Sequence, residues 1–98
     1  MRLNSIIWKN SFAEKIAEKH DVETYEVDEV LFSKPLVRFV QKGRVKGENL
    51  YVAYGQTDEG RYLTVFFIHK QGNVALPISA RDITSSERRY YNDRKKTC

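Results

Sequence analysis

Cysteine and histidine are scarce in this chain of 98 residues, and their scarcity removes whole classes of functional site. The only cysteine is Cys98, the last residue, so neither a disulfide framework nor a thiolate metal site can form within one chain. The two histidines, His20 and His69, stand far apart, and no group of Cys, His or Asp has the spacing of metal ligands. We therefore expect no metal and no cofactor.

Long apolar runs and glycine-rich loops are also missing. The apolar run near the N-terminus is too short for a signal peptide, and no segment is long enough to cross a membrane. There is no Gly-rich phosphate-binding loop, and the acidic residues at 23–29 lack the alternating pattern of a calcium-binding loop. These absences predict a cytoplasmic protein that does not contact a membrane.

Charge is abundant and unevenly distributed. There are 17 Lys+Arg against 13 Asp+Glu, a net charge of +4 and a pI near 9.3. Residues 9–32 carry seven acidic and three basic side chains, whereas 34–48 carry five basic and one acidic, and 81–96 carry six basic and three acidic. A basic C-terminal part suggests a nucleic acid or an acidic protein as partner, although a mixed solvated surface has the same composition.

The N-terminal third predicts one short strand and two helices. Leu3–Trp8 is apolar enough for a strand. The first helix should begin after Ser11, which forms a capping box with Glu14, and should end near His20. The second helix should cover residues 21–33. The residues that we expect to face inward from this second helix are Tyr25 or Val27, Val30 and Leu31.

From Pro35 onward the apolar pattern has the period of two that is typical of strands. The expected strands are 35–41, 49–57, 61–70 and 74–79. Tight-turn signals at Asp58–Gly60 and Gln71–Asn73 join the last three strands into an antiparallel meander. Pro77 cannot donate to a strand ladder, so it predicts an edge or a bulge at that point.

The C-terminal part predicts a final helix. Thr84 is its expected N-cap, with Glu87 completing a second capping box, and Tyr91 should pack inward beside Tyr90. The whole pattern indicates a compact α+β domain over residues 1–93, with two N-terminal helices and a C-terminal helix on a small antiparallel sheet. Residues 94–98 should form a frayed tail.

With metal sites and phosphate-binding loops excluded, the sequence still allows a metal-free site built from bases and cations. RNA can be cut in this way, because its own 2′-hydroxyl is the nucleophile and the protein supplies proton transfer and charge for the phosphate. Arg61 at the start of the central strand and Arg81 after the last strand are the strongest cation candidates, and arginine binds phosphate with two N–H groups. The further basic candidates are Arg44, Lys46, Arg88 and Arg89.

Each candidate also has a purely structural explanation. His20 at a helix C-terminus is stabilised there by the helix dipole, and His69 fits an ordinary surface position. Arg88 and Arg89 fit a solvated helix face. Arg81 is different, because a cation just before a helix N-terminus opposes the local field and needs another reason.

Four segments in order resemble the BrnT toxins of BrnT–BrnA toxin–antitoxin systems. The resemblance runs from about Ile6 to Tyr91, and its most specific part is "ISARDITSSERRYY" at the end. The other segments are Trp8, "EKHDVE" and "GENLYVAYGQTDEGRYLTVFF". Lys9, Asp21 and Pro77 depart from the usual family pattern.

The resemblance implies a fold like the RelE and ParE toxins, and a metal-independent ribonuclease that arrests translation. It also implies a BrnA-like antitoxin with a DNA-binding domain, so that the toxin meets DNA only within that complex. Among the family's residues, Lys19 and His20 match its K-H pair, Arg61 its hairpin arginine, Arg81 the arginine of I-S-A-R, and Glu87–Arg89 its E-R-R.

Together these observations predict a ribonuclease toxin. The expected catalytic residues are His20, Arg61 and Arg81, and the expected RNA-binding residues are Lys19, Arg44, Lys46, Arg88 and Arg89. The alternative is a catalytically inactive binding module that acts only by binding the antitoxin and regulating transcription, since the sequence contains no unambiguous general base.

Overall fold

The computed structural model describes residues 1–96, and the expectations for residues 97–98 lie outside that range. The elements, in order, are β1 (Ser5–Ile6), α1 (Asn10–His20), α2 (Thr24–Phe32), β2 (Leu36–Gln41), β3 (Asn49–Gln56), β4 (Tyr62–Lys70), β5 (Val74–Asp82) and α3 (Ser85–Lys96). The predicted α+β class, with two N-terminal helices and one C-terminal helix, is confirmed.

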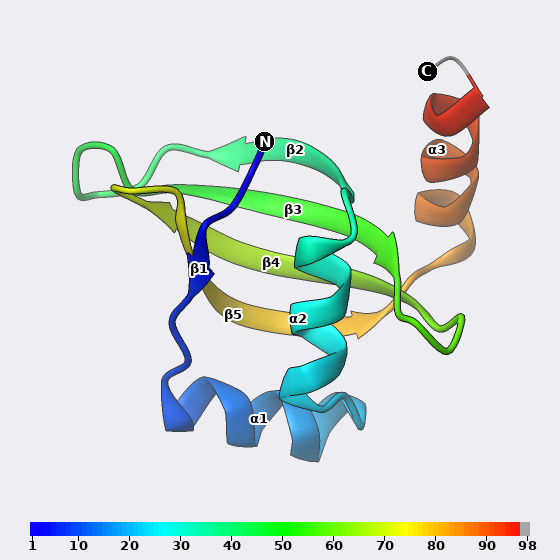
Figure 1. The fold of residues 1–98 in the computed structure, drawn as a ribbon, viewed down its shortest axis with the longest axis horizontal. Coiled ribbons are helices and arrows are strands. Elements are labelled where there is room, and N and C mark those ends of the chain that lie inside the picture. The colour runs from blue at the N-terminus through cyan, green and yellow to red at the C-terminus, as the bar shows by residue number, and fades with distance from the viewer. Residues whose placement is uncertain (97–98) are drawn as a thin grey trace.

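The five strands form one sheet in the order β1-β5-β4-β3-β2 (Figure 1). Strands β2 to β5 are an antiparallel meander, as their short turns predicted. The expectation of a wholly antiparallel sheet was wrong, because β1 pairs with β5 in parallel. The N-terminal strand is also shorter than predicted and keeps two residues, so most of its apolar side chains serve packing rather than pairing.

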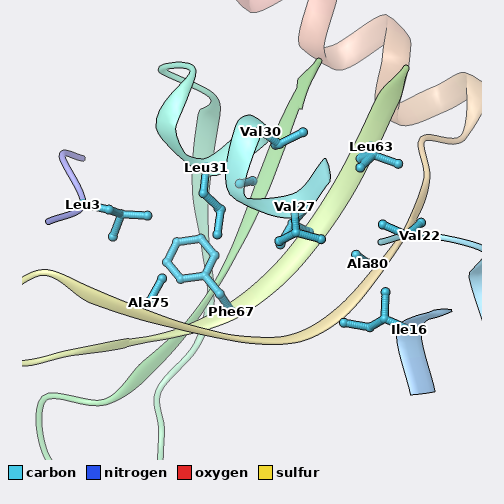
Figure 2. Packing of buried hydrophobic residues seen from close by; sticks show 12 residues of the cluster. Leu3, Ile16, Val22, Val27, Val30, Leu31, Leu63, Phe67, Ala75 and Ala80 are labelled. Carbon is cyan, nitrogen blue, oxygen red and sulfur yellow. The ribbon is translucent and has the colours of Figure 1, made fainter. Parts of the chain in front are cut away.

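Helices α1 and α2 cover one face of the sheet, and the main core lies beneath them (Figure 2). Phe67 of β4 is fully buried and points toward Leu31 of α2. From α2, Val27 rather than Tyr25 faces inward: Val27 is fully buried, whereas Tyr25 is 53% exposed. Strand β4 is central in the sheet, which explains why it is apolar on both faces.

Helix α3 covers only one end of the opposite face (Figure 1). Its predicted capping box is confirmed: the Glu87 N–H donates to Thr84 Oγ1 at 3.2 Å, and the Thr84 N–H donates to Glu87 Oε1 at 2.9 Å. Tyr91 is buried and packs in the small core formed with Val52 and Tyr54. The helix continues through Lys96, and the frayed tail expected over residues 94–98 stays a prediction.

The caps of the N-terminal helices differ from the prediction. Helix α1 begins at Asn10 with Lys9 as its N-cap and has no side-chain cap, so Ser11 and Glu14 do not form a capping box. Helix α2 instead has a capping box of Glu23 and Glu26 that was not predicted. Asp21 ends α1 in the left-handed conformation, with φ of 53°, a position that glycine usually fills.

The β3–β4 turn depends on Gly60, whose φ is 96°. Its N–H donates to the Thr57 carbonyl at 3.0 Å, which closes the turn. An added Cβ would meet only Gln56 Nε2, at 3.5 Å, so Gly60→Ala adds backbone strain without a steric clash. We expect Gly60→Ala to lower the free energy of unfolding by about 1 kcal/mol, measured by urea denaturation. An unchanged midpoint would contradict this turn conformation.

Candidate functional site

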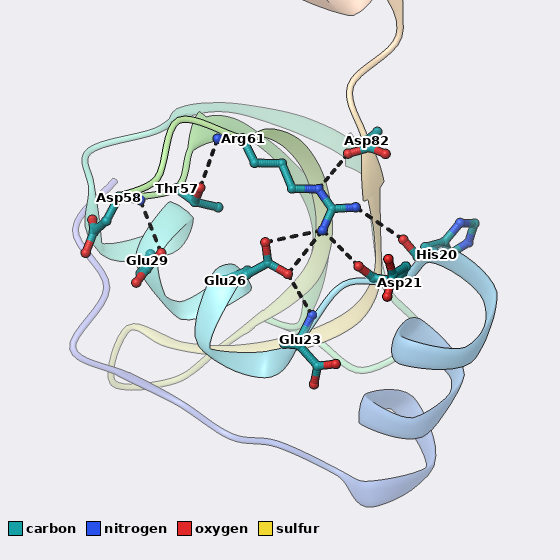
Figure 3. A network of polar contacts seen from close by, with 9 residues as sticks. All are labelled: His20, Asp21, Glu23, Glu26, Glu29, Thr57, Asp58, Arg61 and Asp82. Carbon is teal, nitrogen blue, oxygen red and sulfur yellow. Dashed lines mark hydrogen bonds and ion pairs between the residues drawn. The ribbon is translucent and has the colours of Figure 1, made fainter.

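Arg61 lies at the centre of a polar network that joins the end of α1 to the sheet (Figure 3). Its Nε donates to Asp82 Oδ1 at 2.8 Å, and its Nη1 lies 3.1 Å from Glu26 Oε1. The same guanidinium donates to the carbonyl oxygens of Asp21 at 2.8 Å and of His20 at 3.4 Å. The hydrogen bond to Asp82, and next that to Glu26, raise the pKa of Arg61 further above its ordinary value.

These contacts leave Arg61 little donor capacity for a phosphate, because Nε, Nη1 and Nη2 all have acceptors within the protein. They satisfy carbonyl groups at the end of α1 and hold that end against the last residue of β5. His20 joins this network through its backbone oxygen, and its imidazole points away from Arg61 (Figure 3). The adjacent Lys19 side chain is exposed.

Arg81 has a different neighbourhood, beside α3. Its two terminal nitrogens pair with both oxygens of Glu87, at 2.8 and 2.9 Å, in a bidentate ion pair. Glu87 also accepts from Thr64 Oγ1 at 2.9 Å. The ion pair with Arg81 lowers the pKa of Glu87 to about 2, helped by the backbone N–H of Thr84. Glu87 therefore neutralises the cation that stands before the helix N-terminus and fixes its orientation.

Arg61 and Arg81 lie at the same end of the sheet but on opposite faces. Along β4 and β5, Phe67 pairs with Pro77, yet Phe66 pairs with Ser79, so β5 contains a bulge at this point. The extra residue reverses the alternation of β5 side chains. As a result Asp82 points to the helix-covered face and contacts Arg61, whereas Arg81 points to the α3 face. The structure does not bring His20, Arg61 and Arg81 into one site.

The α3 face contributes one cation that the sequence prediction missed. Arg38 of β2 lies with its guanidinium 4.2 Å from the ring centre of Tyr90, and makes no hydrogen bond or ion pair to residues 1–96. Tyr90 in turn packs edge-to-face against Tyr54, and Tyr54 contributes to the raised pKa of Arg81, after Glu87. Arg38, Tyr90 and Arg81 thus lie on one face of the sheet, with buried Tyr54 beneath Tyr90, and we name this basic and aromatic region the α3-side surface.

The other predicted RNA contacts are dispersed. Arg88 stacks on the Tyr62 ring with 3.4 Å between guanidinium carbon and ring centre, so it anchors α3. Its Nε is buried without a partner among the described residues. Arg89 is exposed on α3, near the α3-side surface. Arg44 and Lys46 are exposed in the β2–β3 loop, at the far end of the sheet from α3 (Figure 1).

Residues 1–96 contain neither a cluster of metal ligands nor a helix that could span a membrane. No group of three or more His, Cys, Asp and Glu is placed to hold a metal ion. No helix there is long and apolar enough to cross a membrane. The arrangement that the described chain does offer is two oriented arginines among aromatic rings, which can bind phosphate and stack against a base.

The Arg81–Glu87 pair predicts a specific acid sensitivity. Because the pKa of folded Glu87, about 2, lies below its ordinary value of 4.5, the stabilisation is complete above pH 4.5 and is lost as pH falls toward 2. We expect a loss on the order of 2 kcal/mol, reduced by the partial exposure of Arg81. Urea unfolding at a series of pH values should show that the free energy of unfolding of wild type exceeds that of Glu87→Gln near neutral pH. This difference should shrink as pH falls. A constant difference between the two proteins would contradict the pairing.

The comparisons with known proteins agree with this fold. A family model described as the ribonuclease toxin BrnT of type II toxin–antitoxin systems matches residues 8–87. The chain is also similar to the crystal structure of the Brucella abortus ribonuclease toxin BrnT, with a TM-score of 0.61 and 17% identity over 83% of this chain and 97% of that chain. No curated protein matches the chain. Because the family model spans most of the sequence, the chain belongs to the BrnT family of type II ribonuclease toxins.

Proposed function

We propose that this chain is an active endoribonuclease toxin that cuts RNA at the α3-side surface and so inhibits translation. Membership of the BrnT family supports the activity. The observation that carries the location is the Arg81–Glu87 pair on the same sheet face as Arg38, which has no acceptor among the described residues. One arginine is held in a fixed orientation and the other keeps its donors available, so an RNA strand that crosses this face can contact both.

In the proposed reaction the RNA 2′-hydroxyl oxygen attacks phosphorus and the bond to the 5′-oxygen breaks. Water accepts the proton from the 2′-oxygen, and water donates one to the departing 5′-oxygen, since neither histidine lies on this face. Arg81 stabilises the extra charge that develops on the phosphate oxygens, without a metal, and Arg38 binds the RNA strand on the same sheet face. Glu87 is too weak a base at a pKa of about 2 to take the proton, and it acts by positioning Arg81.

The proposal changes the roles expected for three residues. Arg61 becomes a structural clamp, because its donors are used within the protein. His20 and Lys19 belong to α1, on the other side of the sheet from Arg81, so we leave both out of the reaction. Of the remaining cations, Arg89 is exposed on α3 itself and would guide the RNA strand.

The family also supports a partner for this toxin. We propose a cytoplasmic complex with a BrnA-like antitoxin that neutralises the ribonuclease and carries a DNA-binding domain, so that the toxin reaches DNA only in that complex. The alternative is an inactive toxin-like module that acts in antitoxin binding alone. One observation favours it: neither histidine lies on the α3 face, since His20 belongs to α1 and His69 packs edge-to-face against Tyr51 on the helix-covered side.

The experiment is RNA cleavage by the purified chain without antitoxin, in the presence of EDTA. The substrate is compared with the same strand carrying one 2′-deoxy nucleotide at the mapped cut site. We expect products with a 2′,3′-cyclic phosphate and a 5′-hydroxyl, and no cleavage of the deoxy strand at that position. Absence of cleavage at high protein concentration supports the inactive module, and cleavage of the deoxy strand refutes attack by the 2′-hydroxyl.

A further inference from the structure

A second surface lies at the end of the sheet that is farthest from α3 (Figure 1). Phe39, Val40 and Val45 are 57%, 41% and 58% exposed, which is unusual for large apolar side chains grouped so closely in sequence. Val45 also lines a hollow of about 320 Å³ between the β2–β3 loop and the sheet, whereas Phe39 lies against Tyr51 on the opposite sheet face. We name Val40, Val45 and the hollow the loop-end patch.

The hollow is apolar at its base and preformed by its loop. Leu50, Ile68 and Ile78 form the base. They lie on the same sheet face as α3, at the end that α3 does not cover. The loop above it is fixed by an ion pair between Lys70 and Glu48 at 2.9 Å. Gly43 lets the two ends of the loop approach each other, because a Cβ at this position would lie 1.8 Å from the Glu48 carbonyl oxygen.

The patch adjoins an open sheet edge. Strand β2 is the last strand of the sheet, and no strand of residues 1–96 pairs with its outer side. Its register with β3 shifts between Phe39 and Gln41, which leaves Val40 unpaired at the edge. An edge with exposed apolar side chains and available backbone groups is a template for an added strand.

The charged side chains around the hollow indicate which kind of molecule it would bind. Lys42, Arg44 and Lys46 are exposed around the hollow and form no ion pair with residues 1–96, whereas Glu48 is neutralised by Lys70. A second copy of this chain would bring like charges together along the edge. RNA is a poorer match, because the base of the hollow offers aliphatic side chains and no aromatic ring for stacking.

We propose that the loop-end patch binds an extended segment of a second protein, with acidic side chains toward the loop and an aliphatic side chain in the hollow. This rests on the proposed function, since the antitoxin is the natural carrier of such a segment. The hollow and Arg81 share one sheet face and lie about four residues apart along β4, roughly 13 Å. A bound segment would therefore lie on the same sheet face as the proposed RNA surface.

The test is a titration of the ¹⁵N-labelled full chain, followed by NMR, with a capped octapeptide of alternating valine and glutamate. The same octapeptide with lysine in place of glutamate is the charge control, and 2′-O-methyl octauridylate represents RNA. We expect the glutamate peptide alone to shift the amides of Gln41, Gly43, Leu50 and Ile68.

Val45→Asp, and separately the pair Arg44→Glu and Lys46→Glu, should weaken binding of the glutamate peptide at least about tenfold. The equal charge change at Lys9→Glu, just before α1, and Lys15→Glu on α1 should leave binding unchanged.

Three results would overturn the proposal: no binding of the glutamate peptide, equal binding of the lysine peptide, or stronger shifts of the same amides by octauridylate. RNA cleavage by the wild-type chain is measured in parallel. Cleavage without peptide binding overturns this inference and leaves the ribonuclease standing. Peptide binding without cleavage refutes the ribonuclease and leaves the docking surface standing.

Discussion

Replacing Arg81 with lysine is expected to lower the rate of RNA cleavage by about 100-fold or more, while the fold stays intact. Lysine keeps the positive charge beside Glu87, so the Glu87 carboxylate stays paired. It loses the planar fork that pairs with both oxygens of Glu87, and with it the fixed orientation toward a phosphate. The loss should therefore appear in the rate of the chemical step.

Single-turnover cleavage measures that step, with the melting temperature as the check on folding. Arg89→Lys is the matched control, because it makes the same substitution at an exposed position of α3. Its cleavage rate should stay close to wild type. Full activity of Arg81→Lys would remove Arg81 from the reaction.

Replacing Arg61 with methionine is expected to lower the free energy of unfolding by about 3 kcal/mol. Methionine keeps the apolar stem but leaves the Glu26 carboxylate, which is 13% exposed, without its ion-pair partner. It also removes the donor to the carbonyl groups of His20 and Asp21. The end of α1 should then detach from the sheet more readily.

Urea denaturation measures this loss, and Lys15→Met on the exposed side of α1 is the control that should cost little. Cleavage by the folded fraction of Arg61→Met, at low temperature, should stay close to wild type. An Arg61→Met protein of normal stability that cuts RNA poorly would show that Arg61 binds the substrate.

The meander and the last helix follow from local signals in the sequence. The turns at Asp58–Gly60 and Gln71–Asn73 fix which strands are neighbours, because two or three residues cannot span farther than an adjacent strand. Thr84 and Glu87 cap α3 as predicted. The parallel pairing of β1 with β5 could not be predicted in this way, because it joins residues at opposite ends of the chain.

The site was predictable in part. Arg81 stood out because its charge opposes the helix dipole, and the structure supplies the compensating group in Glu87. The separation of Arg61 from Arg81 was missed, because unbroken alternation along β5 would place Arg81 on the same face as Ala75 and Pro77. Pro77 did signal a bulge, and counting the extra residue would have placed Arg81 on the other face.

Arg38 was missed for a different reason. It alternates with apolar residues on an edge strand, which is the pattern of any solvent-facing position. Only the tertiary structure shows that Tyr90, distant in sequence, lies against its guanidinium. One sequence signal could have indicated this position: Arg38 alternates onto the same sheet face as Leu36, and Leu36 pairs with Tyr54 of β3.

The central claim is that RNA binds at the α3-side surface and not at the Arg61 network. The most direct measurement is the ¹⁵Nε–¹H spectrum of the arginine side chains during titration with an uncleavable 2′-O-methyl RNA. Our account predicts shifts for Arg38 and Arg81 and an unchanged signal for Arg61. A shift of Arg61 while Arg38 and Arg81 stay unchanged would contradict it.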